Sequence, residues 1–340
     1  MRRMVLMATM AVLLALSLLV SAGFASAKAK GHVVRPGESI QKAVKAADPG
    51  DTIVVLGGVY HETVTIKKDR ISLRGVDAVL KPPAKPTSSS CGPSGGPSGF
   101  CVQADNVSIS GFTVRNFPDT GIFAIGARNA KFMTNRAVNN REYGIAAFSS
   151  TGTQIIANQT SGSDDAGLYV GDNPHANATV AGNETYDNFL GILVRNARHG
   201  KIVGNQTHNN CLGMLFLADE PGPAGVFDVH GNKVVNNTRA CPSFEGAPPL
   251  SGVGIALLGA RGVEIKHNHI VHNVPSGPTG FSGGVVVTKG FKGTPPTDNT
   301  VTGNMILRNK PDIFWDKSGS GNRLKPNNCK TSKPGRLCKG

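Results

Sequence analysis

The chain has 340 residues, a formal net charge of +14, 6% aromatic residues, 43 glycines and six cysteines. The positive charge favours acidic glycans, wall polymers or nucleic acid as neighbours, with general solubility as the alternative, and motifs for nucleic-acid binding are absent. No C-x-x-C pair occurs, which argues against a zinc site and against redox catalysis.

Residues 1–27 have the organisation of a secretory signal peptide. Two arginines precede an apolar run over residues 4–20, and an Ala-Ser-Ala cleavage site ends at Ala27. The alternative is an uncleaved anchor, because the run is nearly long enough to span a bilayer. Cleavage removes two arginines and no acids, which lowers the net charge from +14 to +12. We expect an exported protein that is free of the membrane after cleavage.

The first predicted element of the mature chain is a short amphipathic helix within residues 38–48. Ile40, Val44 and Ala47 share one of its faces. β-Branched runs at 52–56, 64–66 and 71–73 predict the first strands. A stack of strands exposes unpaired backbone at its end, so we expect the helix to cap it. A loop rich in Pro, Ser and Gly follows over residues 81–100.

Residues 106–309 form a tandem repeat. Each unit has a β-branched run, an Asn, a second Asn-rich turn, and a Gly that opens three or four apolar residues. These features predict a solenoid of roughly nine or ten coils stacked about 4.8 Å apart, in which each unit is one coil of a parallel β-helix. The repeated Gly lies at steps of 23, 23, 24 and 22 residues, at Gly121, Gly144, Gly167, Gly191 and Gly213.

The repeated asparagines predict side-chain ladders. An Asn at the same turn of successive coils can bond its neighbours through its amide and tolerates a left-handed backbone. The first Asn of the unit lies at Asn135, Asn158, Asn183 and Asn205. Some of these residues also begin N-x-[ST] triplets, for which glycosylation is the alternative interpretation.

The runs GNETYDNFLGILV and TGNMILRN resemble the degenerate coil repeat of right-handed parallel β-helix proteins, the pectin-lyase-like superfamily. The segment PGESIQKAVKAADPGDTIVVLGGVYHETVTI resembles the opening of many secreted members. The resemblance covers about Val33 to Trp315. It implies an all-β fold, a single right-handed parallel β-helix over residues 28–316 with a short N-terminal capping helix. It does not fix the activity, because this fold hosts many chemistries.

The later coils are longer and carry insertions. Asn205, Asn232, Asn268 and Asn304 are 27, 36 and 36 residues apart, and we expect the inserted loops to wall one side of the solenoid. An even cysteine count in an exported chain predicts disulfides between sequence neighbours. Residues 317–340 are interpreted as a basic, loop-like tail that the last disulfide staples. The predicted pairs are Cys91–Cys101, Cys211–Cys241 and Cys329–Cys338.

Alternation after the repeated Gly separates inward from outward residues. The first and third residues after it are apolar in every coil and must point inward. The outward set is still too apolar for a sheet in water, so we expect loops, a second subunit or a sugar chain stacked on Phe148 and Tyr169 to cover it. This set includes Phe123, Phe148, Tyr169, Leu193, Arg195, Leu215 and Leu217.

A column of carboxylates lies two residues before the same Gly, at Asp119, Glu142 and Asp165. Like charges on adjacent coils repel unless a cation lies among them or one carboxyl keeps its proton. Pectate-lyase-type members of the superfamily bind calcium through such carboxylates, so the resemblance implies a Ca²⁺ site here. The alternatives are that Asp is favoured at turns and that nearby arginines neutralise the column.

The run from Tyr169 to His175 resembles the Tyr-Gly-x-Asp-Pro-His run of alginate C5-epimerases, with one extra residue and with Asn173 directly before the proline. The resemblance implies that Tyr169 and His175 act as acid and base at the sugar C5, with Asp172 beside them. Arg195 or Arg198 would neutralise the carboxylate and the developing enolate, and His199 lies at the same edge. The alternative is a plain Asn-Pro turn with a surface histidine.

Three functions compete. The first is a secreted enzyme, a lyase or C5-epimerase, acting on a uronate-containing polysaccharide. The second is a non-catalytic protein that binds a glycan or the cell wall. The third, an exported maturation factor for a metalloenzyme, is disfavoured because no Met- or Cys-rich metal site is present. An acid, a base and a cation converging in one groove would favour the enzyme, whereas a groove of aromatic residues alone would favour binding.

Overall fold

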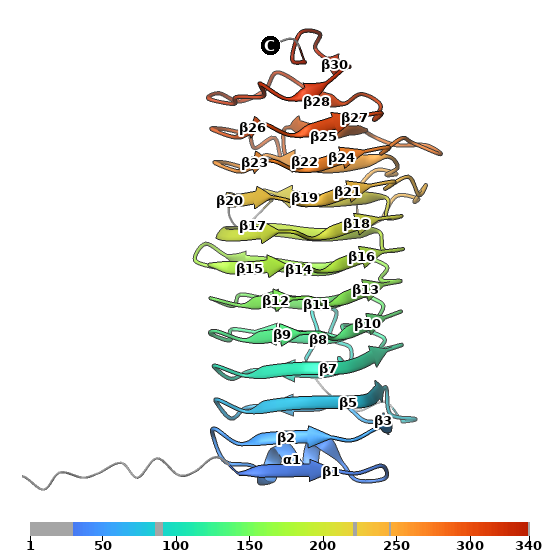
Figure 1. The fold of residues 1–340 in the computed structure, drawn as a ribbon, viewed down its shortest axis with the longest axis vertical. Coiled ribbons are helices and arrows are strands. Elements are labelled where there is room, and N and C mark those ends of the chain that lie inside the picture. The colour runs from blue at the N-terminus through green and yellow to red at the C-terminus, as the bar shows by residue number, and fades with distance from the viewer. Residues whose placement is uncertain (1–29, 86–90, 220–222, 245, 339–340) are drawn as a thin grey trace, which may run out of the picture.

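A computed structural model describes residues 30–85, 91–219, 223–244 and 246–338. The chain climbs through stacked coils from the N-terminal helix to the C-terminus (Figure 1). The predicted signal peptide lies outside the described residues. No helix in the described part of the chain is long and apolar enough to cross a membrane.

Each regular coil contributes three short strands, and each strand pairs in parallel with its equivalent one coil away. The predicted parallel β-helix is therefore confirmed. The strands that follow the repeated Gly form sheet 1, in which eleven described coils take part, slightly more than expected. These strands are β4 (Val64–Ile66), β6 (Phe100–Val102), β8 (Ile122–Ile125), β11 (Tyr143–Phe148), β14 (Ala166–Asn173), the start of β17 (Leu190–Val203), β19 (Leu212–Leu217), β22 (Val253–Leu258), β25 (Gly283–Thr288), β28 (Ile313–Trp315) and β30 (Ser332–Lys333).

Two further sheets complete the coils. Sheet 2 contains β1 (Gly31–Val34), β2 (Thr52–Val55), β9 (Lys131–Met133), β12 (Gln154–Ile156), β15 (Ala178–Ala181), the end of β17, β20 (Gly225–His230), β23 (Glu264–Lys266) and β26 (Thr300–Thr302). Sheet 3 contains β3 (Gly58–His61), β10 (Arg136–Val138), β13 (Gln159–Ser161), β16 (Glu184–Tyr186), β18 (Gln206–His208), β21 (Lys233–Val235), β24 (His269–Val271), β27 (Met305–Leu307) and β29 (Asn328–Cys329). The longer β5 (Ser72–Lys81) and β7 (Ser108–Arg115) run through both sheets.

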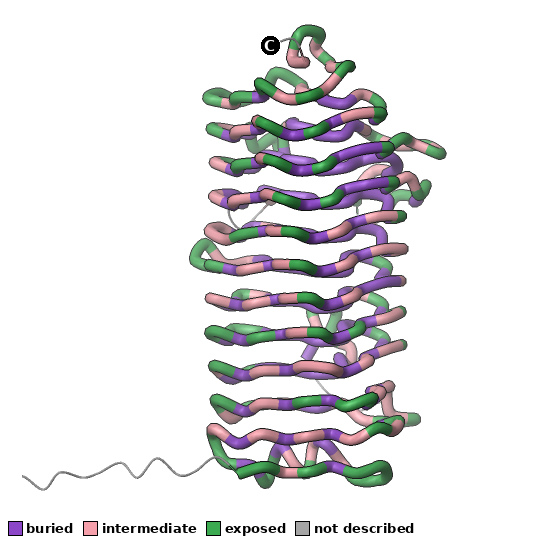
Figure 2. The backbone as a smooth tube through the Cα atoms, viewed as in Figure 1, coloured by how far each residue is buried: buried purple, intermediate pink, exposed green. Residues whose placement is uncertain are grey.

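The core lies inside the coils and follows the predicted alternation. Ile145, Leu168, Ile192 and Met214, the first residues after the repeated Gly, are fully buried in one continuous apolar cluster. Figure 2 shows buried positions recurring along every coil from the base to the top. Because each coil alone cannot enclose these side chains, the stacking of coils is what removes them from water.

The predicted Asn ladder is confirmed. The side-chain oxygen of Asn158 accepts hydrogen bonds from the backbone N–H of Asn135 (2.9 Å) and from its amide (3.1 Å), and the pattern repeats upward through Asn183 and Asn205. The side-chain amides of Asn158, Asn183 and Asn205 are buried in the ladder. A glycan therefore cannot be attached to them in the folded chain.

One detail of the ladder prediction is wrong. The left-handed backbone falls on the residue before each ladder asparagine, not on the asparagine itself, for example on Ala157 (φ 53°) and His267 (φ 54°). The preceding residue makes the turn, and the asparagine then points inward to cap the neighbouring coil.

A second ladder runs beside the first at a constant separation. It links Asn188, Asn210, Asn237, Asn273 and Asn309, again with each side-chain oxygen accepting from the coil below. The two ladders are five residues apart in every coil that carries both, whether the coil is short or long. The pairs are 135/140, 183/188, 205/210, 232/237, 268/273 and 304/309.

The N-terminal helix α1 (Ile40–Ala46) caps the base of the solenoid, as expected. Its buried face contains Ile40 and Val44, and Ser39 accepts a hydrogen bond from the N–H of Lys42 as N-cap. The Glu62 carboxylate accepts from the N–H groups of Ile40 (2.7 Å) and Gln41 (3.0 Å). These bonds satisfy donors that a helix start leaves without partners.

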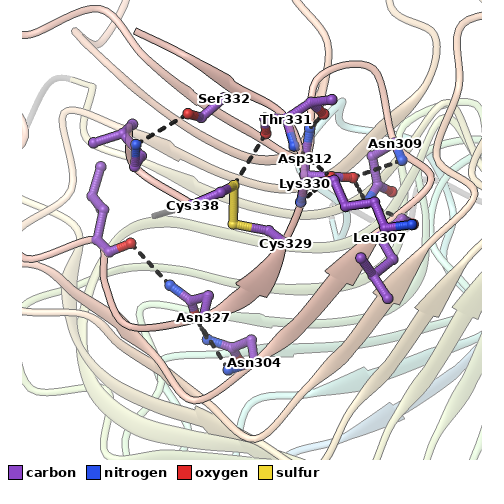
Figure 3. Close-up of a disulfide and its surroundings, with 12 residues drawn as sticks. Asn304, Leu307, Asn309, Asp312, Asn327, Cys329, Lys330, Thr331, Ser332 and Cys338 are labelled. Atoms are coloured by element: carbon purple, nitrogen blue, oxygen red, sulfur yellow. Dashed lines mark hydrogen bonds between the residues drawn. A yellow bond between two sulfur atoms is a disulfide. The ribbon is translucent and has the colours of Figure 1, made fainter. Parts of the chain in front are cut away.

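All three predicted disulfides are present. The C-terminal tail is not a loop throughout, since β29 and β30 add a last partial coil onto β27 and β28. Figure 3 shows the Cys329–Cys338 disulfide beside Asp312. This carboxylate ends the second ladder because it accepts from Asn309 on one oxygen and from the N–H groups of Lys330 and Thr331 on the other.

Candidate functional site

The outward face of sheet 1 is covered, as its apolar character predicted. Its side chains form a second apolar cluster outside the coils, and loops of the same chain contribute Cys91, Cys241 and Leu250 to it. The cover is therefore provided at least in part by the projecting loops. The face itself contributes Phe123, Ala146, Tyr169, Leu193, Leu215, Ala256 and Val286, all buried.

The lower half of this face is filled by its own aromatic rings. The Tyr169 ring stacks on Tyr143 at 4.6 Å between centroids and on Phe148 at 6.2 Å. Tyr169 is only 1% exposed, whereas Phe148 is partly exposed. The expectation that Tyr169 offers its ring to a sugar does not fit this structure, because the side chain is buried against the neighbouring rings.

Tyr169 and Asp172 do come together. The Tyr169 hydroxyl donates a 2.5 Å hydrogen bond to the Asp172 carboxylate, and Asn196 donates to the other oxygen of Asp172 (3.4 Å). Burial, and next the charge of Asp172, raise the pKa of Tyr169 well above its ordinary value. The hydroxyl lies over Gly171, where a Cβ atom would overlap it, so only glycine leaves room for this contact.

The predicted carboxylate column has the expected backbone register. The N–H of Glu142 donates to the carbonyl of Asp119 (3.0 Å), and the N–H of Asp165 donates to the carbonyl of Glu142 (3.3 Å). The side chains, however, have local partners. Asp119 is fully buried and accepts from Ser94, from the N–H of Gly96 (3.1 Å) and from Thr120.

The same holds at the upper end of the column. Asp165 is hydrogen-bonded to the Tyr143 hydroxyl, and burial, then the charge of Asp165, raise the pKa of Tyr143. Over the described residues, no three His, Cys, Asp or Glu side chains form a group that could hold a metal ion. The calcium site at Asp119, Glu142 and Asp165 therefore stays a prediction.

The opposite edge carries the predicted histidines. His175 is exposed in the turn after β14, where its N–H donates to Asn173 (2.8 Å) in an Asn-Pro turn. Its ring lies parallel to that of His199 on the next coil, at 6.5 Å between centroids. Arg198 and His199 lie within the continuous strand β17, not in a turn as expected. Ring contacts thus join His175 to His199, while the hydroxyl of Tyr169 bonds to Asp172.

Arg195 lies on the outward face of β17 and bonds to the next coil. Its Nη2 donates to Asp219 (3.0 Å), and the N–H of Asp219 is held by Asn196 (2.8 Å). Burial lowers the pKa of Arg195, but Tyr169 and Asp219 more than offset this, so the pKa is raised overall. Within the described structure, its buried Nε has no hydrogen-bond partner. A buried donor without a partner carries a desolvation cost, which a hydrogen-bond acceptor placed against it would offset.

Arg195 lines a cavity of about 240 Å³ over the upper half of the outward face, the sheet 1 cavity. Its floor is aliphatic, from Leu190, Leu193, Leu215 and Leu217. Its walls are aromatic side chains from the inserted loops, and its lining also contains two carboxylates and two cations. The walls are Phe244, Phe281 and Phe291, and the charged groups are Asp165, Arg195, Asp219 and Lys292.

The sequence interpretation missed these walls. The insertions were expected beside the face, but the sequence pattern alone does not indicate a role for Phe244, Phe281, Phe291 or Lys292. A signal was available, because each phenylalanine lies within an insertion otherwise rich in Gly, Pro and Ser: CPSFEGAPPLSG, VPSGPTGFSG and KGFKGTPPT. An isolated aromatic residue in such a loop is a candidate contact to a ligand or to the face below.

Comparisons with known proteins agree on the fold. The family model described as "Right handed beta helix region" matches residues 98–248. The chain is a right-handed parallel β-helix. The A-module of the Azotobacter vinelandii mannuronan C-5 epimerase AlgE4 superposes on this β-helix with a TM-score of 0.60 at 15% identity, covering 86% of this chain and 92% of the module.

Other solved β-helices give similar values. The A-module of AlgE6 from the same organism superposes with a TM-score of 0.58 at 18% identity, covering 86% of this chain and 85% of the module. The Dettilon tailspike protein superposes with a TM-score of 0.57 at 14% identity, covering 89% of this chain and 60% of the tailspike. No curated protein sequence matches the β-helix. At these identities the likeness is one of fold.

Proposed function

We propose that this protein is an exported, carbohydrate-active β-helix that binds an acidic, uronate-containing polysaccharide in the sheet 1 cavity. The observation that carries the proposal is the combination in one cavity of three aromatic walls with Arg195, whose buried Nε lacks a partner among the described residues. Aromatic and aliphatic side chains suit the apolar faces of a sugar ring, and a guanidinium suits its carboxylate. The volume of about 240 Å³ is at the small end for ligand pockets and suits one sugar ring at a time.

Two further observations support an exported protein with a polyanionic ligand. The three disulfides fit an oxidising compartment outside the cytosol. The net charge of +12 after residue 27 raises the local concentration of a polyanion. Arg195 and Lys292 are the cations at the cavity, so we assign the carboxylate of the bound uronate to that end.

Catalysis is the second candidate, favoured by the Tyr169–Asp172 hydrogen bond at the edge of the same face. Two structural neighbours are named mannuronan C-5 epimerases. Lyase or epimerase chemistry at C5 would use Tyr169 and His175 as acid and base, and the buried Tyr169 ring would have to leave its contacts with Tyr143 and Phe148. Since that burial opposes access, binding is the function that the geometry supports better.

Calorimetric titration with oligogalacturonate tests the binding. Arg195→Ala should weaken it by about tenfold or more, because a charge-assisted hydrogen bond to the carboxylate is lost. Arg261→Ala is the matched control, since it removes the same charge from an exposed ion pair away from sheet 1. Equal affinities of Arg195→Ala and the parent protein would place the site elsewhere, and equal losses in both variants would reduce the effect to net charge.

The same mixtures test the chemistry. A lyase forms an unsaturated, ultraviolet-absorbing product, and an epimerase exchanges the C5 proton for deuterium in heavy water. If either reaction occurs, His175→Ala should abolish it while glycan binding and folding persist. Binding with neither reaction identifies a non-catalytic glycan-binding protein.

A further inference from the structure

A second cavity, of about 430 Å³, lies next to the sheet 1 cavity. The two share Phe189 and Phe244, whose ring centroids are 5.5 Å apart. These two rings therefore form a common wall. The second cavity lies at the turns that precede β14 and β17, so the two cavities follow one another along the strand direction.

The outer wall of the second cavity is a fixed segment. The Cys211–Cys241 disulfide ties it to β19, and Cys241 pairs with Leu250 through two backbone hydrogen bonds of 2.9 and 3.1 Å. The N–H of Arg239 donates to the carbonyl of Asn210 (3.3 Å), and its Nη1 donates to the carbonyl of Asn188 (3.4 Å). The Arg239 guanidinium is therefore already engaged with the backbone of the coil.

The charges of the two cavities differ. Among the described lining residues, the sheet 1 cavity has two carboxylates and two cations, whereas the second cavity has the carboxylates of Asp164 and Asp187 and the guanidinium of Arg239. Asp164 is exposed and Asp187 accepts a hydrogen bond from the amide of Asn209. Two acceptors with a net negative charge favour hydroxyl groups or an amine and oppose a second carboxylate.

We propose that the second cavity is a subsite for the neighbouring residue of the bound glycan, and that it takes a non-acidic sugar while the sheet 1 cavity takes the uronate. This inference rests on the proposed function and deepens it. The preferred ligand is then a heteropolysaccharide in which uronate alternates with a neutral or amino sugar, not a homopolymer of uronates. Phe189 and Phe244 contact the linkage between the two residues.

The test compares two probes of equal length by calorimetry: an oligosaccharide of alternating glucuronate and N-acetylglucosamine, and oligogalacturonate. The parent protein should bind the alternating probe about tenfold or more tightly, because the homopolymer places a carboxylate against Asp164 and Asp187. Asp164→Asn with Asp187→Asn should reduce this preference at least about fivefold, mainly by tighter binding of oligogalacturonate. Glu264→Gln with Asp298→Asn removes the same charge away from the cavities and should leave the preference unchanged.

The outcomes separate the two proposals. If neither probe binds, the proposed function fails, and the inference fails with it. If both bind but the homopolymer binds equally or more tightly, or if the double variant keeps the parent preference, the inference is overturned while the proposed function stands. Asp164→Asn alone, at an exposed side chain, repeats the test if the double variant is unstable.

Discussion

The apolar outward face of sheet 1 is covered differently in its lower and upper halves. In the lower half, Phe123, Tyr143, Phe148 and Tyr169 pack on one another. In the upper half, the corresponding strands carry Leu193 and Leu215, and loops bring the aromatic rings from above. The strands have the same register in both halves, so the two halves differ in their side chains: aromatic rings fill the face below, and leucines line a cavity above.

The largest contrast should come from truncating one buried side chain in each half. Tyr169→Ala should lower the free energy of unfolding by about 3–5 kcal/mol, because a closely packed ring is lost. Leu215→Ala, at the floor of an existing cavity, should cost nearer about 2 kcal/mol, the low end for leucine. Denaturant unfolding of both variants measures the difference. Equal costs would show that the two halves are packed equally well.

The two disulfides at this face sharpen the contrast. Replacing Cys211 and Cys241 by Ala removes a disulfide between residues 30 apart in the chain and should lower the free energy of unfolding by about 3.6 kcal/mol. The same change at Cys91 and Cys101, which are 10 residues apart, should lower it by about 2.7 kcal/mol. Only the first pair holds the wall of the cavities, so only its loss should also weaken glycan binding. Unfolding and titration of both double variants test this. Equal affinities in the two would separate binding from the wall.

A smaller effect is expected at Gly171, where the lower half is most crowded. Gly171→Ala should cost about 1–3 kcal/mol, because the new methyl group overlaps the Tyr169 hydroxyl. Adding Tyr169→Phe removes that hydroxyl and should recover part of the loss. A double-mutant cycle from unfolding measurements gives the coupling. Additive costs would mean that the methyl group clashes with something else.

The smallest effect concerns acid, at the base of the solenoid below the lower half. Hydrogen bonds from His32 (2.8 Å) and from the N–H groups of Asp48 and Lys30 lower the pKa of Asp51 from 3.8 to about 2. A lowered folded-state pKa contributes stability that is complete above about pH 4 and is lost as the pH falls through about 2. The unfolding midpoint of the parent should fall over this range, and that of Asp51→Asn should fall less. Parallel curves would contradict this role.

The sequence predicted the repeating parts of the molecule well. The coil register, the Asn ladder, the capping helix and all three disulfides depend on local patterns that recur or on residues that are neighbours in the chain. When coils stack, residues at the same place in the repeat lie directly above one another, so the pattern predicts where each of them lies. Even the left-handed turn was missed by a single residue, because the ladder asparagine and its neighbour share the turn.

The candidate site was predicted less well because it depends on non-repeating contacts. Register alone placed Tyr169 on the outward face, but its exposure depends on how Tyr143 and Phe148 pack, which the pattern does not specify. Register alone places Asp119 in the carboxylate column, but it does not show that the loop rich in Gly and Ser donates hydrogen bonds to this carboxylate. The cavity walls come from insertions whose path the repeat does not determine.

Because the two Asn ladders are always five residues apart, coils of different length can stack on one another in the same way. Coils of 22 to 36 residues all align these five residues in the same way, so chain length is free to vary only outside them. A foreign loop grafted between residues 238 and 252 lies outside the two ladders and would leave the bonds of Asn232 to Asn268 and of Asn237 to Asn273 in place. The loops that line the cavities can therefore be exchanged, and the ligand changed with them, while the asparagine ladders that support the coils stay the same.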